Sequence, residues 1–382
     1  MSSTETASNT TAPTQYATIG DSKYAYRQFG SGPGAPLLFL QHFTGTLDNW
    51  DPAVTDPLAL GRSVILFENA GIGRSTGRVP ETVAGMADHA LKFMDALRLT
   101  QVDVLGFSLG GMVAQVMALK QPALLRRMIL TGTGPEGGVG VAMDRPELLK
   151  IFVDQKMPMN EKLLKLFFEP TETSQSAGRQ FVQRLGRRTR DKDTPTSAEA
   201  AGAQLGAMAA WARSGGEPYA ELKKITQPVL VTNGNNDTMI PTVNSFALSA
   251  HLPNAQLIIY PDSGHGALFQ HAGAFTSMCQ SSSIATSTTE IKEIRSVTKE
   301  HPCLELPSLS GARGPVARAR PSPNGLTKSR KGVATPSLNL WISKISTCRS
   351  STSQCRRSWA STPTITPKHG RQRSPHSMPT SS

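Results

Sequence analysis

The sequence predicts an α/β fold whose sheet is buried on both faces. From about residue 16 to 278, short apolar runs alternate with amphipathic segments, a pattern typical of strands and helices packed in layers. Most of the runs are apolar throughout, as strands covered on both faces must be. Beyond residue 280 the alternation stops, so we place the folded domain at residues 16–280.

Seven strands are expected in this domain, because seven short runs rich in apolar residues are bounded by polar or turn-forming residues. They are Lys23–Phe29, Leu37–Gln41, Ser63–Phe67, Val102–Phe107, Met128–Thr131, Val229–Thr232 and Gln256–Tyr260.

Three helices are expected between these strands. Val83–Leu97 carries apolar residues at an approximate spacing of three to four, which places them on one face of a helix. Leu109–Leu119 follows the fourth expected strand almost without a loop. A further helix is expected from Pro241 to about Leu252, because proline suits the first helical turn.

Residues 132–228 separate two expected strands and show little strand character. The helices expected there are Glu147–Gln155, Asn160–Phe168, Ser174–Arg188 and Ser197–Arg213. We interpret this insertion, over about residues 140–222, as a lid that covers the C-terminal edge of the sheet and shapes a pocket. Four arginines of the lid suggest either an anion site or a solvated helix face, and we expect the solvated face. They are Arg184, Arg187, Arg188 and Arg190.

The whole net charge of +12 comes from the C-terminal part of the chain. Residues 281–382 hold 16 of the 40 Lys and Arg but only 4 of the 28 Asp and Glu, and 43 of these residues are Ser, Thr or Pro. Their scattered apolar residues are too few to bury a core, so we expect a disordered basic tail. The tail has no repeated motif and no interleaved aromatic residues, so no specific binding of nucleic acid is expected.

The N-terminal residues 1–15 contain no Lys or Arg and no apolar run. They are therefore expected to be a disordered leader and not a secretory signal. No stretch approaches the roughly 18 to 20 apolar residues that a membrane span needs, so we expect a cytoplasmic protein. Three of the four cysteines lie in the tail, and no Cys or His spacing fits a metal site, so structural zinc is not expected.

The strongest chemical signal is the segment Gly106-Phe107-Ser108-Leu109-Gly110, which fits the G-x-S-x-G pattern of nucleophilic serines. It lies between an apolar strand and a helix, as that pattern requires. In so tight a turn the residues two before and two after the serine must be small, and both are glycine. The alternative is an ordinary glycine-rich turn. We predict that Ser108 is a nucleophile.

A serine hydroxyl needs a base, and the base needs an acid that orients it. His265, in a glycine-flanked loop after the strand Gln256–Tyr260, is the expected base, and Asp237, after the preceding strand, is the expected acid. The order Ser, Asp, His along the chain agrees with this architecture. Glu136 and Asp262 are rival acids, and a turn histidine and a turn aspartate are the alternatives without a catalytic role.

Two N–H groups are needed to hold the oxyanion of a tetrahedral intermediate. The backbone amide of Leu109 is one expected donor, because it lies at the start of a helix. The backbone amide of Phe43, in the loop after the strand Leu37–Gln41, is the other. His42 in the same loop is either a second base or a structural residue, and we favour the structural role.

Together these segments resemble the α/β-hydrolase superfamily, and within it the serine hydrolases that include small esterases and cofactor-free haloperoxidases. The resemblance extends over about residues 16–278. It rests on five motifs, which are His42–Gly45, Asn69–Ser75, Gly106–Gly111, Gly234–Asp237 and Ser263–His265.

The resemblance implies an eight-stranded, mostly parallel sheet with helices on both faces, a helical lid, and no metal or organic cofactor. It also implies a catalytic triad of Ser108, Asp237 and His265. The chain departs from many members of the superfamily at two side chains, since position 43 is Phe in place of Gly and position 68 is Glu in place of Asp. The helix that starts at Ala267 is in addition cut short.

Attack by a serine hydroxyl implies a carbonyl substrate, and the expected partner is a small molecule. We expect hydrolysis of a carboxylic ester, lactone or thioester of a small apolar molecule through an acyl-Ser108 intermediate. Three alternatives stay open: hydrolysis of a carbon–carbon bond, perhydrolysis of the haloperoxidase kind, and a non-catalytic binding protein on the same fold. The sequence leaves the oligomeric state open.

Overall fold

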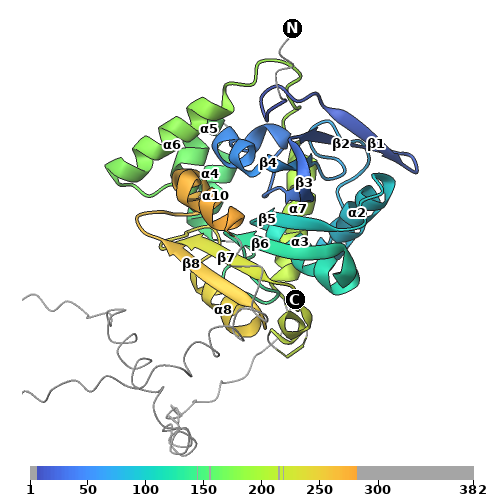
Figure 1. The fold of residues 1–382 in the computed structure, drawn as a ribbon. Coiled ribbons are helices and arrows are strands. Elements are labelled where there is room, and N and C mark those ends of the chain that lie inside the picture. Colours follow the sequence, from blue (N-terminus) through green and yellow to red (C-terminus); the bar gives the residue numbers. More distant parts are fainter. Residues whose placement is uncertain (1–6, 144, 155, 214–215, 218, 282–382) are drawn as a thin grey trace, which may run out of the picture. The chain divides into compact units, whose positions relative to one another are not determined.

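An eight-stranded sheet organises the part of the chain that the computed structural model describes, residues 7–143, 145–154, 156–213, 216–217 and 219–281 (Figure 1). The strands are β1 (Gln15–Ile19), β2 (Ser22–Phe29), β3 (Ser31–Leu40), β4 (Leu60–Phe67), β5 (Val102–Phe107), β6 (Leu125–Thr131), β7 (Val229–Gly234) and β8 (Ala255–Tyr260). Their order across the sheet is β1-β2-β4-β3-β5-β6-β7-β8, and all strands from β4 to β8 in that order run parallel. The mostly parallel sheet is thus confirmed.

The strand pattern of the sequence predicts β2 to β8 but not β1. Of the residues of β1 only Ala17 is buried, and the strand pairs antiparallel with β2 at the edge of the sheet. An edge strand of five residues leaves no continuous apolar run, so its sequence resembles that of a loop.

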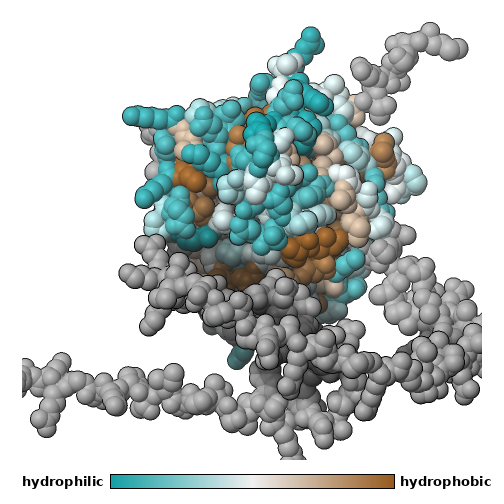
Figure 2. Space-filling model, turned by 90° about the vertical axis from the view of Figure 1, so that its left-hand side faces the viewer, coloured by the Kyte–Doolittle hydropathy of each residue, from teal (hydrophilic) through white to brown (hydrophobic). Residues whose placement is uncertain are grey.

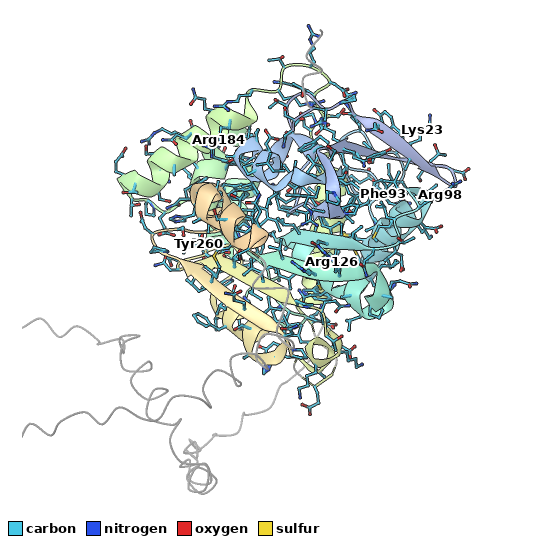
Figure 3. All side chains as sticks on the ribbon, in the orientation of Figure 1. Lys23, Phe93, Arg98, Arg126, Arg184 and Tyr260 are labelled. Carbon is cyan, nitrogen blue, oxygen red and sulfur yellow. The ribbon has the colours of Figure 1, made fainter. Side chains whose placement is uncertain are left out.

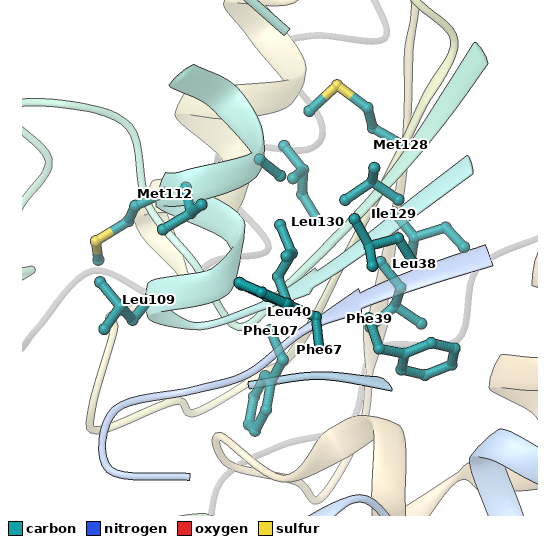
Figure 4. Packing of buried hydrophobic residues seen from close by; sticks show 14 of the residues in the cluster. Leu38, Phe39, Leu40, Phe67, Phe107, Leu109, Met112, Met128, Ile129 and Leu130 are labelled. Atoms are coloured by element: carbon teal, nitrogen blue, oxygen red, sulfur yellow. The ribbon is translucent and has the colours of Figure 1, made fainter. Parts of the chain in front are cut away.

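The central strands form the core, as the continuous apolar runs predict. Every residue of β5 is buried, and the last four residues of β3, Leu37 to Leu40, are at most 2% exposed (Figure 4). Parallel pairing of β3, β5, β6 and β7 ends near Leu40, Phe107, Thr131 and Thr232. The carboxyl ends of these strands therefore share one edge of the sheet, where loops can bring distant residues together.

Two groups of helices cover the sheet. One group contains α2 (Val83–Ala96) and α3 (Leu109–Lys120), which pack against each other, and the other contains α1 (Pro52–Leu58) and α10 (Ala272–Gln280). The helix α8 (Val243–His251) packs on β7 and β8. The helix expected from Ala267 is divided into two. The first part, α9 (Ala267–Gln270), is separated from α10 by His271.

Four helices lie between β6 and β7, where the sequence predicts a lid. They are α4 (Pro146–Val153), α5 (Met159–Phe167), α6 (Glu172–Leu185) and α7 (Ala198–Trp211), drawn in green in Figure 1. Side-chain caps fix the start of two of them, because Thr171 accepts from Ser174 N–H before α6 and Ser197 accepts from Ala200 N–H before α7. The bounds differ from the expected ones by only a few residues, and the expected helical character is confirmed.

Two lid arginines do not lie on a solvated face, so that expectation was wrong for them. Arg184 (Figure 3) donates three hydrogen bonds, of 2.7, 2.8 and 3.1 Å, to the two carboxylate oxygens of the fully buried Asp51. Arg188 is only 4% exposed. Its Nη1 atom donates to the backbone carbonyls of Asn9, Thr10 and Ala12.

The same contacts correct the expected leader. Asn9 is 3% exposed, and its side-chain amide donates to the Trp50 carbonyl at 3.0 Å and to the Thr55 hydroxyl at 2.9 Å. Residues 9–15 are therefore part of the fold and not of a disordered leader. The backbone carbonyls of this segment accept from the guanidinium of Arg188, and its polar side chain Asn9 donates to Trp50 and Thr55. Residues 1–6 lie outside the described residues.

The surface of the described part is mostly hydrophilic on the face shown in Figure 2, with a few separate hydrophobic patches. Within the described ranges, we find no helix that combines the length and the apolar character needed to cross a membrane. The tail expected over residues 281–382 lies outside the described residues, apart from Ser281 at its start.

Candidate active site

Ser108 lies in a strained turn between β5 and α3. Its backbone has φ 55° and ψ −117°, in a region that residues other than glycine rarely adopt. A Cβ atom on Gly106 would lie 2.5 Å from the Gly110 carbonyl oxygen, and one on Gly110 would collide with the Leu40 carbonyl oxygen. The expectation that both positions must be small is thus confirmed by the close approach of the backbone.

Asp237 and His265 are brought into contact from the loops that follow β7 and β8. Nδ1 of His265 lies 2.7 Å from Oδ2 of Asp237, and both side chains are fully buried. Oδ1 of Asp237 accepts the N–H groups of Met239 at 2.8 Å and Ile240 at 3.0 Å. A carboxylate can only accept a hydrogen bond, so Nδ1 of His265 must be the donor and carries the imidazole proton. In the neutral ring Nε2 then has a free lone pair.

The two rival acids lie elsewhere. The carboxylate of Asp262 accepts a hydrogen bond from the Thr171 hydroxyl at 2.8 Å. Glu136 is exposed and lines a separate cavity together with Trp211. The structure therefore pairs His265 with Asp237, the acid that the strand order favours.

Ser108 and His265 approach the same point of the backbone. The N–H of Ser108 donates to the Thr131 carbonyl at 2.9 Å, and a Cβ atom on the next residue, Gly132, would lie 3.2 Å from Nδ1 and Cε1 of His265. Oγ of Ser108 and Nε2 of His265 are buried, and neither forms a hydrogen bond with any described residue. The hydroxyl of Ser108 and Nε2 of His265 therefore remain available to a molecule that enters between them.

The loop that holds Phe43 lies against the start of α3. A Cβ atom on Gly110 would contact the carbonyls of both Leu40 and Gln41, so this loop and the Leu109 amide are neighbours. Gln41 fixes the loop, because its side chain donates to the Thr46 carbonyl at 2.8 Å and accepts from His42 N–H at 2.9 Å. Among the described residues, no acceptor pairs with the N–H of Phe43 or Leu109.

His42 is buried beside this loop and is uncharged at neutral pH. Its Nδ1 atom lies 2.8 Å from the Phe43 carbonyl, and its ring packs edge-on against Phe107 and Phe167. Burial lowers the pKa of His42 to about 4, and the neighbouring His265 contributes to this shift. These contacts are those of a structural residue that holds the loop, the role that the sequence favours.

A cavity of about 370 Å³ lies between this loop and the lid. Its apolar walls include Phe43, Phe152, Leu163, Leu166, Phe167 and Met239. Asp48, Asp193, Lys162 and four threonines add polar groups to the lining. A mainly apolar cavity of this size with a few polar groups suits a small organic molecule.

A buried ion-pair network fixes the two aspartates of the cavity lining, Asp48 and Asp193. The guanidinium of Arg27 is fully buried and contacts the carboxylates of Asp48 and Asp193, each at 2.7 Å. The N–H groups of Asp48 and Asp193 each donate to the other residue's carboxylate, at 2.7 and 2.8 Å. Burial, together with the charge of Asp193, raises the pKa of the nearby Glu68 to about 8.

The lid is tied directly to the loops that carry Asp237 and His265. The Gly266 N–H donates to the Phe167 carbonyl at 2.8 Å, and the Asn236 side chain donates to the Glu169 carboxylate at 2.8 Å. A third tie joins Thr171 to Asp262. Sequence reasoning did not find these contacts or the position of Phe167 beside His265, because no local pattern records which lid residue meets a loop about 100 residues away.

Comparisons with known proteins agree with this architecture. The family model for the alpha/beta hydrolase fold matches residues 35–272. A solved alpha/beta hydrolase fold protein from Chitinophaga pinensis is 42% identical with a TM-score of 0.68, and the alignment covers 72% of this chain and 98% of that one.

Two curated relatives are enzymes of named activity. A 2-hydroxy-6-oxo-6-phenylhexa-2,4-dienoate hydrolase of Burkholderia cepacia is 30% identical over 64% of this chain and 82% of its own length. A 2-hydroxymuconate semialdehyde hydrolase of Pseudomonas sp. (strain CF600) is 27% identical over 65% and 86%. With a family model that spans most of the described residues and a fold that agrees with it, the chain belongs to the alpha/beta hydrolase family.

Proposed function

We propose that this protein is a serine hydrolase that cleaves a carboxylic ester, lactone or thioester of a small apolar molecule. The observation that best supports this is the buried pair of His265 and Asp237 beside the strained turn of Ser108, with Oγ of Ser108 and Nε2 of His265 both left without a partner among the described residues. A positioned base and a nucleophile at the end of a sheet are what acyl transfer to serine requires.

Each group has a defined part in this mechanism. Oγ of Ser108 attacks the carbonyl carbon while its proton passes to Nε2 of His265, and Asp237 stabilises the imidazolium that forms. The N–H groups of Phe43 and Leu109 hold the oxyanion. Collapse of the intermediate releases the alcohol or thiol, which takes the proton from His265. Water, deprotonated by the same histidine, then attacks the acyl carbon and frees Ser108.

The cavity between loop and lid supports a mainly apolar substrate. Its walls are aromatic and aliphatic, and they suit the apolar part of a small ester or lactone. The two carboxylates of the lining, Asp48 and Asp193, are each paired with the buried guanidinium of Arg27, and Lys162 adds a positive charge. The support for an ester or lactone therefore comes from the apolar wall and not from the charged groups.

Hydrolysis of a carbon–carbon bond is a second candidate, which the two curated relatives favour. Both are named hydrolases, one of a dienoate and one of a semialdehyde. Oγ of Ser108, deprotonated by His265, would attack the carbonyl carbon of such a substrate. The adjoining carbon–carbon bond would then break, the leaving carbon would take the proton from His265, and water would hydrolyse the acyl-serine as above. Loss of absorbance of a 2-hydroxy-6-oxodienoate would detect this activity, and turnover faster than that of any ester would favour it over the first candidate.

The test compares the wild type with Ser108→Ala on short p-nitrophenyl esters. We expect kcat to fall on the order of 10⁴-fold or more in the variant. A fluorophosphonate probe should label the wild type and not the variant, and peptide mass analysis should place the label on Ser108. Equal ester turnover by the two proteins would refute the mechanism. Fluorophosphonate labelling without ester turnover would limit the failure to the substrate class.

A further inference from the structure

Phe167 lies between the cavity and the proposed catalytic residues. It lines the cavity, and its ring centre is 5.4 Å from that of His265 and 5.4 Å from that of His42. Ser108 and His265 are at most 1% exposed, and neither belongs to the cavity lining. In this conformation the ring of Phe167 therefore separates the cavity from the base.

The cavity lining also includes residues from two loops of the site. Phe43, whose N–H is a proposed oxyanion donor, belongs to its lining, and so does Met239, whose N–H donates to Asp237. A molecule in the cavity is thus next to both loops of the site. Removal of one aromatic ring would join the cavity to the space beside His265.

Hydrogen bonds fix the backbone around Phe167. Its carbonyl accepts the N–H of Gly266, directly after His265, and the nearby residues Glu169 and Thr171 are held by Asn236 and Asp262. Movement of the whole lid would break these three hydrogen bonds. The ring of Phe167 is also held, because it is buried and packs against neighbouring aromatic rings, so it is a fixed wall of the cavity.

The next residue, Phe168, provides a matched comparison. It is 4% exposed and Phe167 is 2% exposed, so both are buried phenylalanines at the end of α5. Both rings contact Phe181 of α6, at 6.4 Å for Phe167 and 5.7 Å for Phe168. The ring contacts of Phe168 do not include His265 or His42, although a Cβ atom on Gly266 would lie 3.4 Å from its ring. It does not line the cavity.

We propose that the side chain of Phe167 determines the size of acyl group that the enzyme accepts, because it closes the cavity to the acyl chain. This rests on the proposed ester hydrolysis. A short acyl group needs little space beside His265, whereas a long one must pass the ring and occupy the apolar cavity. Burial of additional methylene groups there would favour the long ester once the ring is removed.

The experiment measures kcat/KM for p-nitrophenyl acetate and p-nitrophenyl octanoate with the wild type, Phe167→Ala, Phe167→Trp and Phe168→Ala. We expect Phe167→Ala to raise the ratio of octanoate to acetate by about tenfold or more, since a single methylene in an apolar pocket is worth about 10-fold to 200-fold. Phe167→Trp should lower the ratio, and Phe168→Ala should leave it within about twofold of the wild type. Thermal midpoints show whether each variant is folded.

Several outcomes overturn the proposal. An unchanged ratio in folded Phe167→Ala would overturn it. Equal changes of the ratio in Phe167→Ala and Phe168→Ala would also overturn it, because each variant loses one buried ring but only Phe167 lines the cavity. If Phe167→Ala does not fold, Phe167→Leu takes its place, and it should raise the ratio in the same direction by a smaller factor. Failure of the proposed function is a separate result, since Ser108→Ala would then hydrolyse both esters as fast as the wild type.

Discussion

Oδ2 of Asp237 lies 2.7 Å from Nδ1 of His265, while Oδ1 of the same carboxylate accepts two backbone N–H groups. The two oxygens therefore have different tasks. One fixes the loop after β7, and the other fixes the tautomer of the histidine. A substitution that changes only Oδ2 should therefore lower the activity without lowering the stability of the fold.

Asp237→Asn is such a substitution. The amide oxygen can still accept the N–H groups of Met239 and Ile240, but its NH₂ group now faces Nδ1 of His265. The imidazole proton must then move to Nε2, which can no longer accept the proton of Ser108, so kcat should fall on the order of 10⁴-fold. The thermal midpoint should change little. Asp262→Asn, at the rival acid, should retain most of the activity. If Asp262→Asn lost activity while Asp237→Asn kept it, the assignment of Asp237 as the acid would be wrong.

The close packing of Gly110, in the first turn of α3, leads to a prediction about stability. A Cβ atom on Gly110 would collide with the Leu40 carbonyl in the core, so Gly110→Ala should prevent folding or cost more than about 4 kcal/mol. Gly202 in α7 is exposed, and a Cβ atom there would meet nothing within 4 Å. Gly202→Ala should stabilise by about 0.5–1 kcal/mol. Urea unfolding measures both changes, and effects of the same sign would count against the structure.

The buried network of Arg27 makes a third prediction. Arg27→Met leaves the carboxylate of Asp193, 1% exposed, without its guanidinium, and this should lower the free energy of unfolding by about 3–5 kcal/mol. The pair of Arg74 and Asp191 is about a third exposed, so Arg74→Met should cost no more than about 1 kcal/mol. Urea midpoints at pH 7 should differ accordingly. Equal decreases in the free energy of unfolding would show that the buried ion pair contributes no more to stability than the exposed one, which would contradict the prediction.

Glu68 gives the stability a predictable dependence on pH. Burial raises its pKa from the ordinary value of 4.5 to about 8, so between these values the folded chain holds a proton that the unfolded chain has released. The contribution of protonated Glu68 is complete below pH 4.5 and is lost as the pH rises to 8. The free energy of unfolding of the wild type should therefore decline across this window.

Glu68→Gln should remove that decline. The amide resembles the protonated acid, and its oxygen can still accept the N–H groups of Arg74 and Ser75. The variant should gain stability relative to the wild type steadily from pH 5 to pH 8, measured by urea unfolding at each pH. Parallel curves for the two proteins would show that Glu68 does not titrate in this window.

The sequence was a good guide to those parts of the site that depend on near neighbours. Gly106 is small because the backbone of the same turn, at Gly110, approaches it, so this part of the pattern around Ser108 records a local steric requirement. Gly110 is small because the backbone of a distant segment, at Leu40 and Gln41, approaches it. Asp237 and His265 follow two apolar strands, and adjacent parallel strands end at one edge. Their contact could thus be expected from the strand order alone.

Residues from distant segments were predicted less well. Arg188 was expected on a solvated face, and residues 9–15 were expected to be disordered, yet each holds the other in the structure. A polar segment and an arginine show no sign in the sequence that they are partners. β1 was missed for a related reason, since a half-exposed edge strand has no apolar run of its own.

The amino-acid sequence by itself determined the α/β architecture, the tight turn at Ser108 and the histidine and aspartate that accompany it, because periodicity and glycine spacing express forces between residues close along the chain. Only the tertiary structure decided that Phe167 of the lid packs beside His265 and that Arg27 is buried between two carboxylates. Those contacts arise when the lid packs on the sheet, and packing selects partners by shape and charge in three dimensions.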